Sequence, residues 1–341
     1  MSTLPRFRLE RPRSLEEALR LLALGPGVLP VAGGTDLVPS MKQGLFVPRV
    51  LVDLKAVPEL GSFRADERGT HLGAATRIAR LRDDPDVTRR HPALARAAAE
   101  LASPPIQNAA TLGGNLCLDT RCLYYNQSAF WRQSLGGCLK RGADVCRAAP
   151  GSDRCLAVAA ADTVPALIAL DARVHLVRWE RGGPAERTIP LEALYAPDGA
   201  AHLRIGPGEI VTGVALPAGE GVRSGFLKFR RRASIDYPLA NVAVAFRVEG
   251  GRMRRVRIAV GGLGPAPVLA QEAMEILEGQ APLPERLERA AQRVTSGTRP
   301  APNQHSTPGH RRRMARVMAR RLLEALAGEG PPDGGSPPAV R

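Results

Sequence analysis

The sequence predicts an α+β protein built from two or three subdomains. Its 341 residues are too many for one ordinary hydrophobic core, and 44% of them are hydrophobic, as in globular proteins. Short apolar runs typical of strands alternate with segments whose apolar residues recur at helical spacing. The chain has no internal repeat, so we expect a mixed fold with more than one core.

The first hundred residues are predicted to alternate helices and strands. Residues 14–24 begin with Ser14, a candidate helix cap, and continue with leucine and alanine at helical spacing. Pro104 stops the last helix of this part. The predicted elements are a helix over 14–24, a strand, glycine turn and helix over 28–44, a strand over 49–57, a strand and helix over 70–87, and a helix over 91–103.

The second half is predicted to contain hairpins followed by helices. Its predicted elements are a helix and hairpin over 162–191, a strand over 209–217, paired strands over 225–264 and helices between 268 and 328. Glycines near 218–223 indicate a boundary, and the proline- and glycine-rich end is typical of disorder. We therefore predict domains over 1–217 and 222–327, followed by a disordered tail over 328–341.

The chain has a formal net charge of +15, which raises the question of nucleic-acid binding. Its arginines are spread along the sequence, aromatic residues make up only 4%, and no nucleic-acid-binding motif is present. We therefore expect no nucleic-acid partner. Two basic concentrations, 228–234 and 310–321, are either solvated charge or a docking surface for an acidic protein.

No apolar run reaches the roughly 18 residues of a membrane span, and the N-terminus lacks the apolar core of a signal peptide. We therefore expect a cytoplasmic protein with no membrane contact. Disulfides are rare in that compartment, where grouped cysteines are more often metal ligands or catalytic groups.

Two glycine turns stand out as candidate binding loops. Consecutive glycines after a strand leave backbone N–H groups unshielded, and such turns suit phosphate oxygens. Neither turn is a GxGxxG motif or a P-loop, so tight structural turns remain the alternative. Together, the two turns could hold both phosphates of a dinucleotide. They consist of Val31, Ala32, Gly33, Gly34, Thr35 and Asp36, and of Thr111, Leu112, Gly113, Gly114 and Asn115.

Four motifs follow one another along the chain: VAGGTDLVPSMKQG, NAATLGGNL, ADTVPALIALDARVHL and FLKFRRRASIDYPLANVAVAF. In this order and spacing the sequence resembles the FAD-binding medium subunits of the molybdenum hydroxylase (xanthine oxidase) family, over roughly residues 5–327. The resemblance implies FAD as cofactor and a two-part, PCMH-like FAD-binding domain. It also implies a C-terminal domain with a three-stranded antiparallel sheet and a helical bundle.

The resemblance further implies which residues contact FAD. Backbone N–H groups of the two turns would hold the pyrophosphate, and Asp162 would hydrogen-bond the cofactor. Lys228 would lie near the flavin, and Tyr237 could approach the isoalloxazine ring, with surface charge and ordinary packing as the alternatives. No residue of this chain would touch the substrate, so no catalytic residue is predicted.

All the cysteines lie between residues 115 and 157, in a spacing that lacks the CxxC pairs of a zinc ribbon. Four thiolates around a metal can hold together a loop that is hard to bury. From the residues alone, an iron–sulfur cluster, a zinc ion and free thiols all remain open. The cysteines are Cys117, Cys122, Cys138, Cys146 and Cys155.

Residues 116–156 form an insertion that resembles that of the β subunits in the 4-hydroxybenzoyl-CoA reductase branch of the family. This resemblance implies a [4Fe–4S] cluster bound by Cys122, Cys138, Cys146 and Cys155, with Cys117 not ligating iron. It implies a molybdenum-cofactor large subunit and a [2Fe–2S] small subunit as partners, in a dimer of heterotrimers. Reduced ferredoxin would be the electron donor.

The expected function is electron transfer, from ferredoxin through the cluster and FAD toward molybdenum, for reductive dehydroxylation of 4-hydroxybenzoyl-CoA. The alternative is the FAD subunit of a related hydroxylase or dehydrogenase that oxidises an aromatic or N-heterocyclic substrate. A scaffold without cofactor is disfavoured by the intact glycine turns. Basic residues of the insertion would suit an acidic ferredoxin, or would be solubilising charge: Arg121, Arg132, Lys140, Arg141, Arg147 and Arg154.

Overall fold

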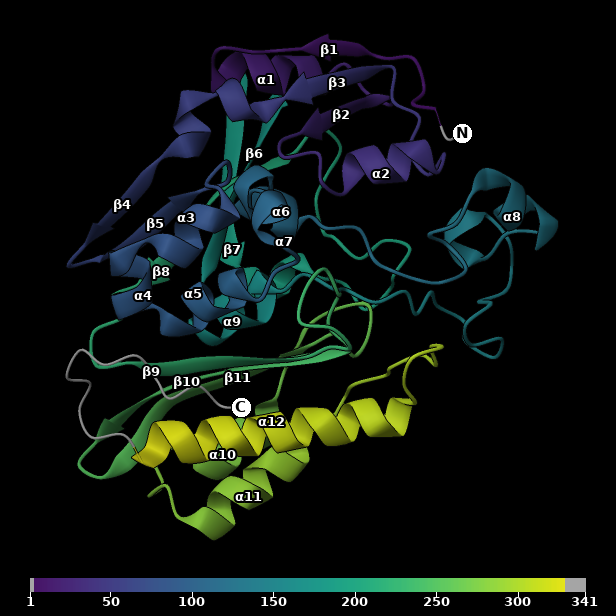
Figure 1. Cartoon of the computed structure of the whole chain (residues 1–341). Coiled ribbons are helices and arrows are strands. Elements are labelled where there is room, and N and C mark those ends of the chain that lie inside the picture. The colour runs from purple at the N-terminus through teal and green to yellow at the C-terminus, as the bar shows by residue number, and fades with distance from the viewer. Residues whose placement is uncertain (1–2, 329–341) are drawn as a thin grey trace.

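The computed structural model describes residues 3–328 as three β-sheets in successive layers, with helices between and around them (Figure 1). Buried apolar side chains form three clusters. One belongs to the N-terminal sheet, one to the middle of the molecule, and one to the C-terminal sheet and its helices. This architecture confirms the predicted α+β class.

A small parallel sheet in the order β1-β3-β2 begins the chain. Ser14 caps its first helix as predicted, because its Oγ accepts a hydrogen bond from the N–H of Glu17 at 3.1 Å. The strand predicted over 49–57 is shorter, since Asp53 accepts from the N–H of Lys55 and starts a 3₁₀ turn. The elements are β1 (Arg8–Glu10), α1 (Leu15–Leu22), β2 (Val28–Val31), α2 (Leu37–Lys42) and β3 (Val50–Asp53).

The middle sheet is antiparallel throughout, in the order β4-β5-β8-β6-β7. Its strands are β4 (Phe63–Asp66), β5 (Gly69–Gly73), β6 (Arg173–Glu180), β7 (Gly183–Pro190) and β8 (Ile210–Pro217). Proline stands at the first position of three of its helices, where its missing N–H costs no hydrogen bond. The helices are α3 (Ile78–Asp83), α4 (Pro85–Arg90), α5 (Pro92–Ala99), α6 (Pro104–Ala109), α7 (Leu112–Leu116) and α9 (Thr163–Ala169).

The C-terminal sheet contains three long antiparallel strands, as predicted, and a fourth strand of two residues at its edge, in the order β12-β11-β10-β9. Helices follow the sheet in sequence and cover one of its faces (Figure 1). The elements are β9 (Arg223–Phe229), β10 (Ala240–Glu249), β11 (Arg252–Gly261), β12 (Val268–Leu269), α10 (Gln271–Leu277), α11 (Pro284–Arg293) and α12 (Pro308–Gly328).

Strand β10 contributes to two cores because its side chains alternate between the faces of the sheet. Val242 and Val244 belong to the cluster formed with α10, α11 and α12. Ala243 and Ala245 belong to the cluster of the middle region, whose helices α5 and α9 contact the opposite face of the sheet. The C-terminal sheet therefore lies between the two sets of helices (Figure 1).

The insertion over 116–156 has little regular structure. It contains α8 (Ala129–Ser134) and a 3₁₀ turn (Leu139–Arg141), and α8 lies at the edge of the molecule (Figure 1). An isolated bridge between Arg121 and Val158 brings together the chain entering and leaving it. The predicted domain limits stay predictions, and apart from Gly328, which ends α12, the predicted tail lies outside the described residues.

Within residues 3–328 no helix has the length and apolar character that crossing a membrane requires.

In the basic segment 310–321, Arg311 is 1% exposed and donates to the carbonyls of Leu239, Ala301 and Gly262. This arginine therefore fastens α12 to the sheet and is neither solvated nor available to a partner.

Candidate cofactor-binding site

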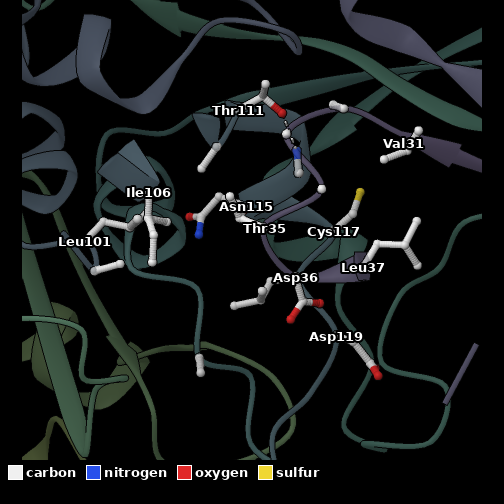
Figure 2. Close-up of a pocket in the computed structure, with 18 of the residues that line it drawn as sticks. Val31, Thr35, Asp36, Leu37, Leu101, Ile106, Thr111, Asn115, Cys117 and Asp119 are labelled. Carbon is white, nitrogen blue, oxygen red and sulfur yellow. Dashed lines mark hydrogen bonds between the residues drawn. The ribbon is translucent and has the colours of Figure 1, made fainter. Parts of the chain in front are cut away.

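A cavity of about 390 Å³ lies between the two glycine turns (Figure 2). One wall is the end of β2 with the first turn. The second is the segment from α5 to α7, which contains the second turn. The third is the loop that precedes β10 in the C-terminal domain. The sequence motifs thus meet at one place although they lie far apart in the chain.

The first turn offers unpaired backbone donors. The N–H groups of Gly33, Gly34 and Thr35 have no acceptor within the described part of the chain. Gly33 packs so closely that an added Cβ would lie 2.2 Å from the carbonyl oxygen of Ala109, and Gly34 has a φ of +68°. Glycine is therefore required at both positions, and the turn can present N–H groups to phosphate oxygens.

The second turn uses its backbone donors internally. The N–H of Gly113 donates to the carbonyl of Ala74 at 2.8 Å, and the N–H of Gly114 donates to Thr111 Oγ1 at 3.2 Å. The N–H of Asn115 donates to the carbonyl of Thr111 at 2.9 Å. We expected both turns to present backbone donors, but only the first does so. In the second, Ala74 accepts from Gly113, and Thr111 accepts from Gly114 through its hydroxyl and from Asn115 through its carbonyl.

Asn115 links the second turn to α9. Its Oδ1 accepts hydrogen bonds from the backbone N–H and the Oγ1 of Thr163, at 3.2 and 2.6 Å. These bonds fix the start of α9, where Asp162 lines the cavity and is 4% exposed. Asp162 Oδ1 is buried and has no hydrogen-bond partner within residues 3–328. A ligand hydroxyl or N–H would satisfy this oxygen.

Lys228 compensates the charge of Asp162. Its Nζ lies 2.8 Å from Asp162 Oδ2 and donates to the carbonyl of Glu100 at 3.0 Å, in a fully buried position. Burial raises the pKa of Asp162 to about 6, and the Lys228 ammonium opposes that rise. Lys228 does not line the cavity, so it acts on the site through Asp162. Its contact with a flavin stays a prediction.

The third wall is a strained loop. Ile235 and Ala102 have φ values of +69° and +42° although neither is glycine, and the N–H of Ile235 donates to the carbonyl of Ala102 at 2.8 Å. Tyr237, 45% exposed, lies beside them on the cavity. The Arg121 guanidinium stands 4.8 Å from the centroid of the Tyr237 ring and 2.8 Å from Asp36. Arg121 thus connects the insertion, the first turn and the C-terminal domain.

Most residues predicted to contact FAD meet at this cavity. Gly113 does not line it and instead packs against Ala74, where an added Cβ would lie 2.8 Å from the Ala74 Cβ. Lys228 stands behind the wall. The predicted residues that line the cavity are Val31, Ala32, Gly33, Gly34, Thr35, Asp36, Thr111, Gly114, Asn115, Asp162 and Tyr237.

Several residues that line the cavity were not predicted from the sequence. Leu101 and Ile106 form an apolar part of the wall (Figure 2), and such side chains carry no motif that distinguishes them from core residues. Cys117 also lines the cavity, and burial raises the pKa of its thiol to about 12. Asp119 lines it as well. One carboxylate oxygen of Asp119 lies 2.5 Å from Lys140 Nζ, and the other has no partner within residues 3–328.

The four predicted metal ligands are grouped in the insertion. Cys138, Cys146 and Cys155 are buried, and Cys122 is half-buried. Burial raises the pKa of the Cys122 thiol. Within residues 3–328, however, no three Cys, His, Asp or Glu side chains converge closely enough to hold a metal ion. The four cysteines thus share the insertion but form no metal-ion site in the part of the chain that the structure describes.

Most basic side chains of the insertion make internal contacts. Arg132 is 7% exposed and donates to the carbonyls of Gln43 and Gly44. Lys140 pairs with Asp119, and Arg121 and Arg147 bond within the protein. These contacts leave fewer of the basic side chains for an acidic ferredoxin than the sequence suggested, and docking of ferredoxin stays a prediction. The exposed basic side chains of the insertion are Arg141 and Arg154.

The cavity combines backbone N–H donors, which suit phosphate oxygens, with an apolar wall and the ring of Tyr237. Residues 5–219 match the family model of the FAD binding domain in molybdopterin dehydrogenase, and residues 225–326 match that of the CO dehydrogenase flavoprotein C-terminal domain. The fold is therefore that of a FAD-binding flavoprotein. The chain belongs to the FAD-binding medium subunits of the CO dehydrogenase and xanthine oxidase family of molybdenum hydroxylases, which are oxidoreductases.

Individual relatives match over nearly the whole chain. The 6-hydroxypseudooxynicotine dehydrogenase complex subunit alpha of Paenarthrobacter nicotinovorans is 31% identical, over 91% of this chain and 90% of that protein. The nicotine 6-hydroxylase medium subunit of the same organism is 30% identical, over 94% and 97%. A chain of the carbon monoxide dehydrogenase of Hydrogenophaga pseudoflava superposes with a TM-score of 0.77 at 26% identity, over 95% and 98%. The family predicted from the sequence is confirmed, whereas the 4-hydroxybenzoyl-CoA reductase branch is not distinguished.

Proposed function

We propose that this chain holds FAD in the cavity between the glycine turns and is the electron-transfer subunit of a molybdenum hydroxylase or dehydrogenase. Its partners would be a molybdenum-cofactor large subunit and a [2Fe–2S] small subunit, and the holoenzyme would oxidise an aromatic or N-heterocyclic substrate. Relatives named medium subunit and a relative named for nicotine, an N-heterocycle, support this proposal. The observation that carries it is one cavity that has, among the described residues 3–328, backbone donors without acceptors on one wall and a carboxylate oxygen without a partner on another.

The residues of the cavity fit FAD in three ways. The first turn would donate its free N–H groups, including those of Gly33 and Gly34, to the pyrophosphate. Asp162 Oδ1 would accept a hydrogen bond from a hydroxyl or N–H of the cofactor, with Lys228 keeping the carboxyl charged near neutral pH. Tyr237 would pack beside the ring system. When bound, FAD supplies the redox chemistry, and the protein supplies binding and orientation.

The test is to purify the chain together with its partner subunits and to measure FAD per chain and flavin absorbance. One FAD per chain is expected, and anaerobic addition of an N-heterocyclic or aromatic substrate should bleach the flavin absorbance. A complex without flavin would contradict the cofactor assignment. A flavin that no such substrate reduces would contradict the direction of electron flow.

A second candidate is favoured by one observation, the grouping of four thiols in the insertion. On this hypothesis Cys122, Cys138, Cys146 and Cys155 bind a [4Fe–4S] cluster, and the holoenzyme is a 4-hydroxybenzoyl-CoA reductase that receives electrons from reduced ferredoxin. A four-iron cluster is larger than a single ion, so its ligands stand further apart than those of zinc. The burial of three of these four cysteines, in a loop with little regular structure, supports the hypothesis.

Quantifying iron, sulfide and zinc in the purified complex separates the two candidates. The reductase hypothesis expects a further four irons and four sulfides beyond those of the small subunit. The substitution Cys122→Ser should remove them, and the matched control Cys117→Ser should keep them. Zinc in the insertion, or unchanged iron in Cys122→Ser, would rule out the cluster and leave the oxidative enzyme.

A further inference from the structure

The insertion reaches the cofactor cavity through the short helix α2. Arg132, on α8, is 7% exposed and donates through Nη1 to the carbonyl of Gln43 and through Nη2 to that of Gly44, both at 3.1 Å. It also donates to the carbonyl of Gln127 in its own loop. The guanidinium is planar and its donors have fixed directions. Hydrogen bonds from this buried group to several carbonyls therefore fix the positions of the segments that provide those carbonyls.

The segment that leaves α2 has further contacts with the insertion. Gly44 has a φ of +67°, and a Cβ added there would lie 3.7 Å from the Cβ of Ala129 and 3.8 Å from Arg132 Nη2. Arg141 Nη1 donates to the carbonyl of Leu45 at 3.4 Å. The carboxyl end of α2 therefore packs directly on the insertion.

The opposite end of α2 belongs to the cavity. Thr35, Asp36 and Leu37 line it, and Asp36 pairs with Arg121 at the start of the insertion. Hydrogen bonds connect this end to the body of the helix, since the N–H of Val38 donates to the carbonyl of Gly34 at 3.0 Å. At 1.5 Å per residue, a helix of six residues is about 9 Å long and can shift only as a unit.

We propose that Arg132 is a positioning residue for FAD. It fixes the carboxyl end of α2, so that the first glycine turn at the amino end keeps the backbone geometry that contacts the cofactor. The conformation of the insertion and the affinity for FAD are then coupled. Coupling of this kind is reciprocal, so FAD binding must also stabilise the insertion. The inference rests on FAD binding by the family fold and does not require metal in the insertion.

The first experiment compares two arginines of the same loop in the full chain. Arg147 is the matched control, because it donates to the carbonyls of Gly137 and Leu135 inside the insertion and not to α2. We expect Arg132→Met to raise the Kd for FAD about tenfold or more, measured by quenching of flavin fluorescence. Arg132→Lys should lie between it and the wild type, and Arg147→Met should change the Kd less than about twofold. Equal Kd values for Arg132→Met and the wild type, or equal losses in both Met variants, would overturn the proposal.

The second experiment uses the wild-type chain and so does not depend on a variant that folds. Hydrogen exchange of the amides in residues 128–137 should slow when FAD is added. The same amides in Arg132→Lys should be protected less. Exchange in this segment that is indifferent to FAD would overturn the coupling. A wild-type chain that binds no FAD would instead contradict the proposed function, so the two failures are distinguishable.

Discussion

The two glycine turns look alike in the sequence and differ in the structure. In the first, the N–H groups of Gly33 and Gly34 have no acceptor among residues 3–328, and the backbone packs closely against Ala109. The second forms a capped helix start in which Thr111 accepts from the N–H of Gly114. A pair of glycines therefore indicates close backbone packing, and the acceptors that the fold places beside the pair decide whether its donors remain available to a ligand.

The turns also differ in the segments that support them. The first is followed by α2 and the insertion, whereas the second is tied through Asn115 and Thr163 to the buried pair of Asp162 and Lys228. The first turn thus depends on a peripheral loop and the second on the interior. Substitutions at the two turns should consequently change the free energy of unfolding and the binding of FAD by different amounts.

The largest effect is expected for Lys228→Met, which leaves the Asp162 carboxylate buried without its counter-charge. Burial already raises the Asp162 pKa to about 6, so the folded chain holds this proton more tightly than the unfolded chain. The associated stability is present below about pH 4 and is lost as the pH rises through 6. Without the ammonium the pKa rises further. The destabilisation should therefore be about 3–5 kcal/mol at pH 8 and smaller at pH 5, as measured by urea unfolding.

A surface lysine provides the control for that measurement. Lys55 is exposed, so Lys55→Met should change the free energy of unfolding by less than about 0.5 kcal/mol at either pH. Equal losses for Lys228→Met at pH 5 and pH 8 would show that the carboxyl of Asp162 does not titrate in this range, and the interior role given to the second turn would fail.

The next effect tests the first turn. In Gly33→Ala the added Cβ would stand 2.2 Å from a backbone oxygen that cannot move alone, and we expect about 1–3 kcal/mol of destabilisation together with a roughly tenfold loss of bound FAD. In Gly114→Ala the Cβ would meet the Thr111 Oγ1 at 3.1 Å, and that side chain can rotate. FAD per chain and urea midpoints should therefore change less in Gly114→Ala. If Gly114→Ala lost more FAD and more stability than Gly33→Ala, the second turn and not the first would be the one whose backbone contacts the cofactor.

The smallest effect is expected for Thr111→Ala. Loss of the cap should lower the free energy of unfolding by about 1 kcal/mol, and Thr111→Ser should retain most of it. Affinity for FAD should change little, because the hydroxyl already accepts from Gly114 within the protein. A loss of affinity larger than the loss of stability would show that Thr111 contacts the cofactor directly.

The sequence supplied the two turns, the capped first helix, Asp162 and the family, because each has a local signature that one stretch of chain can carry. It did not supply the partners of these groups. The approach of Gly33 to Ala109 and the pairing of Lys228 with Asp162 join residues far apart in the chain. The apolar wall of Leu101 and Ile106 has the composition of any core.

Charge was the property that the sequence predicted least well. Arg132, Lys140 and Arg311 read as surface residues, yet each is directed at carbonyls or a carboxylate inside the protein. Their acceptors are mostly backbone oxygens, which every residue carries and no motif reveals. Arginine in this chain is therefore often a structural donor, and a net charge counted from composition overstates the charge presented to partners.

The position of the C-terminal sheet has a consequence for cooperativity. Its inner face, with Ala243 and Ala245, shares a core with α5 and α9 of the other domain. Produced as two separate polypeptides divided near residue 220, each half would expose that alanine-lined interface to water. The intact chain should then melt in one calorimetric transition. The boundary between the two family models, near residue 220, would then not separate two regions that fold independently.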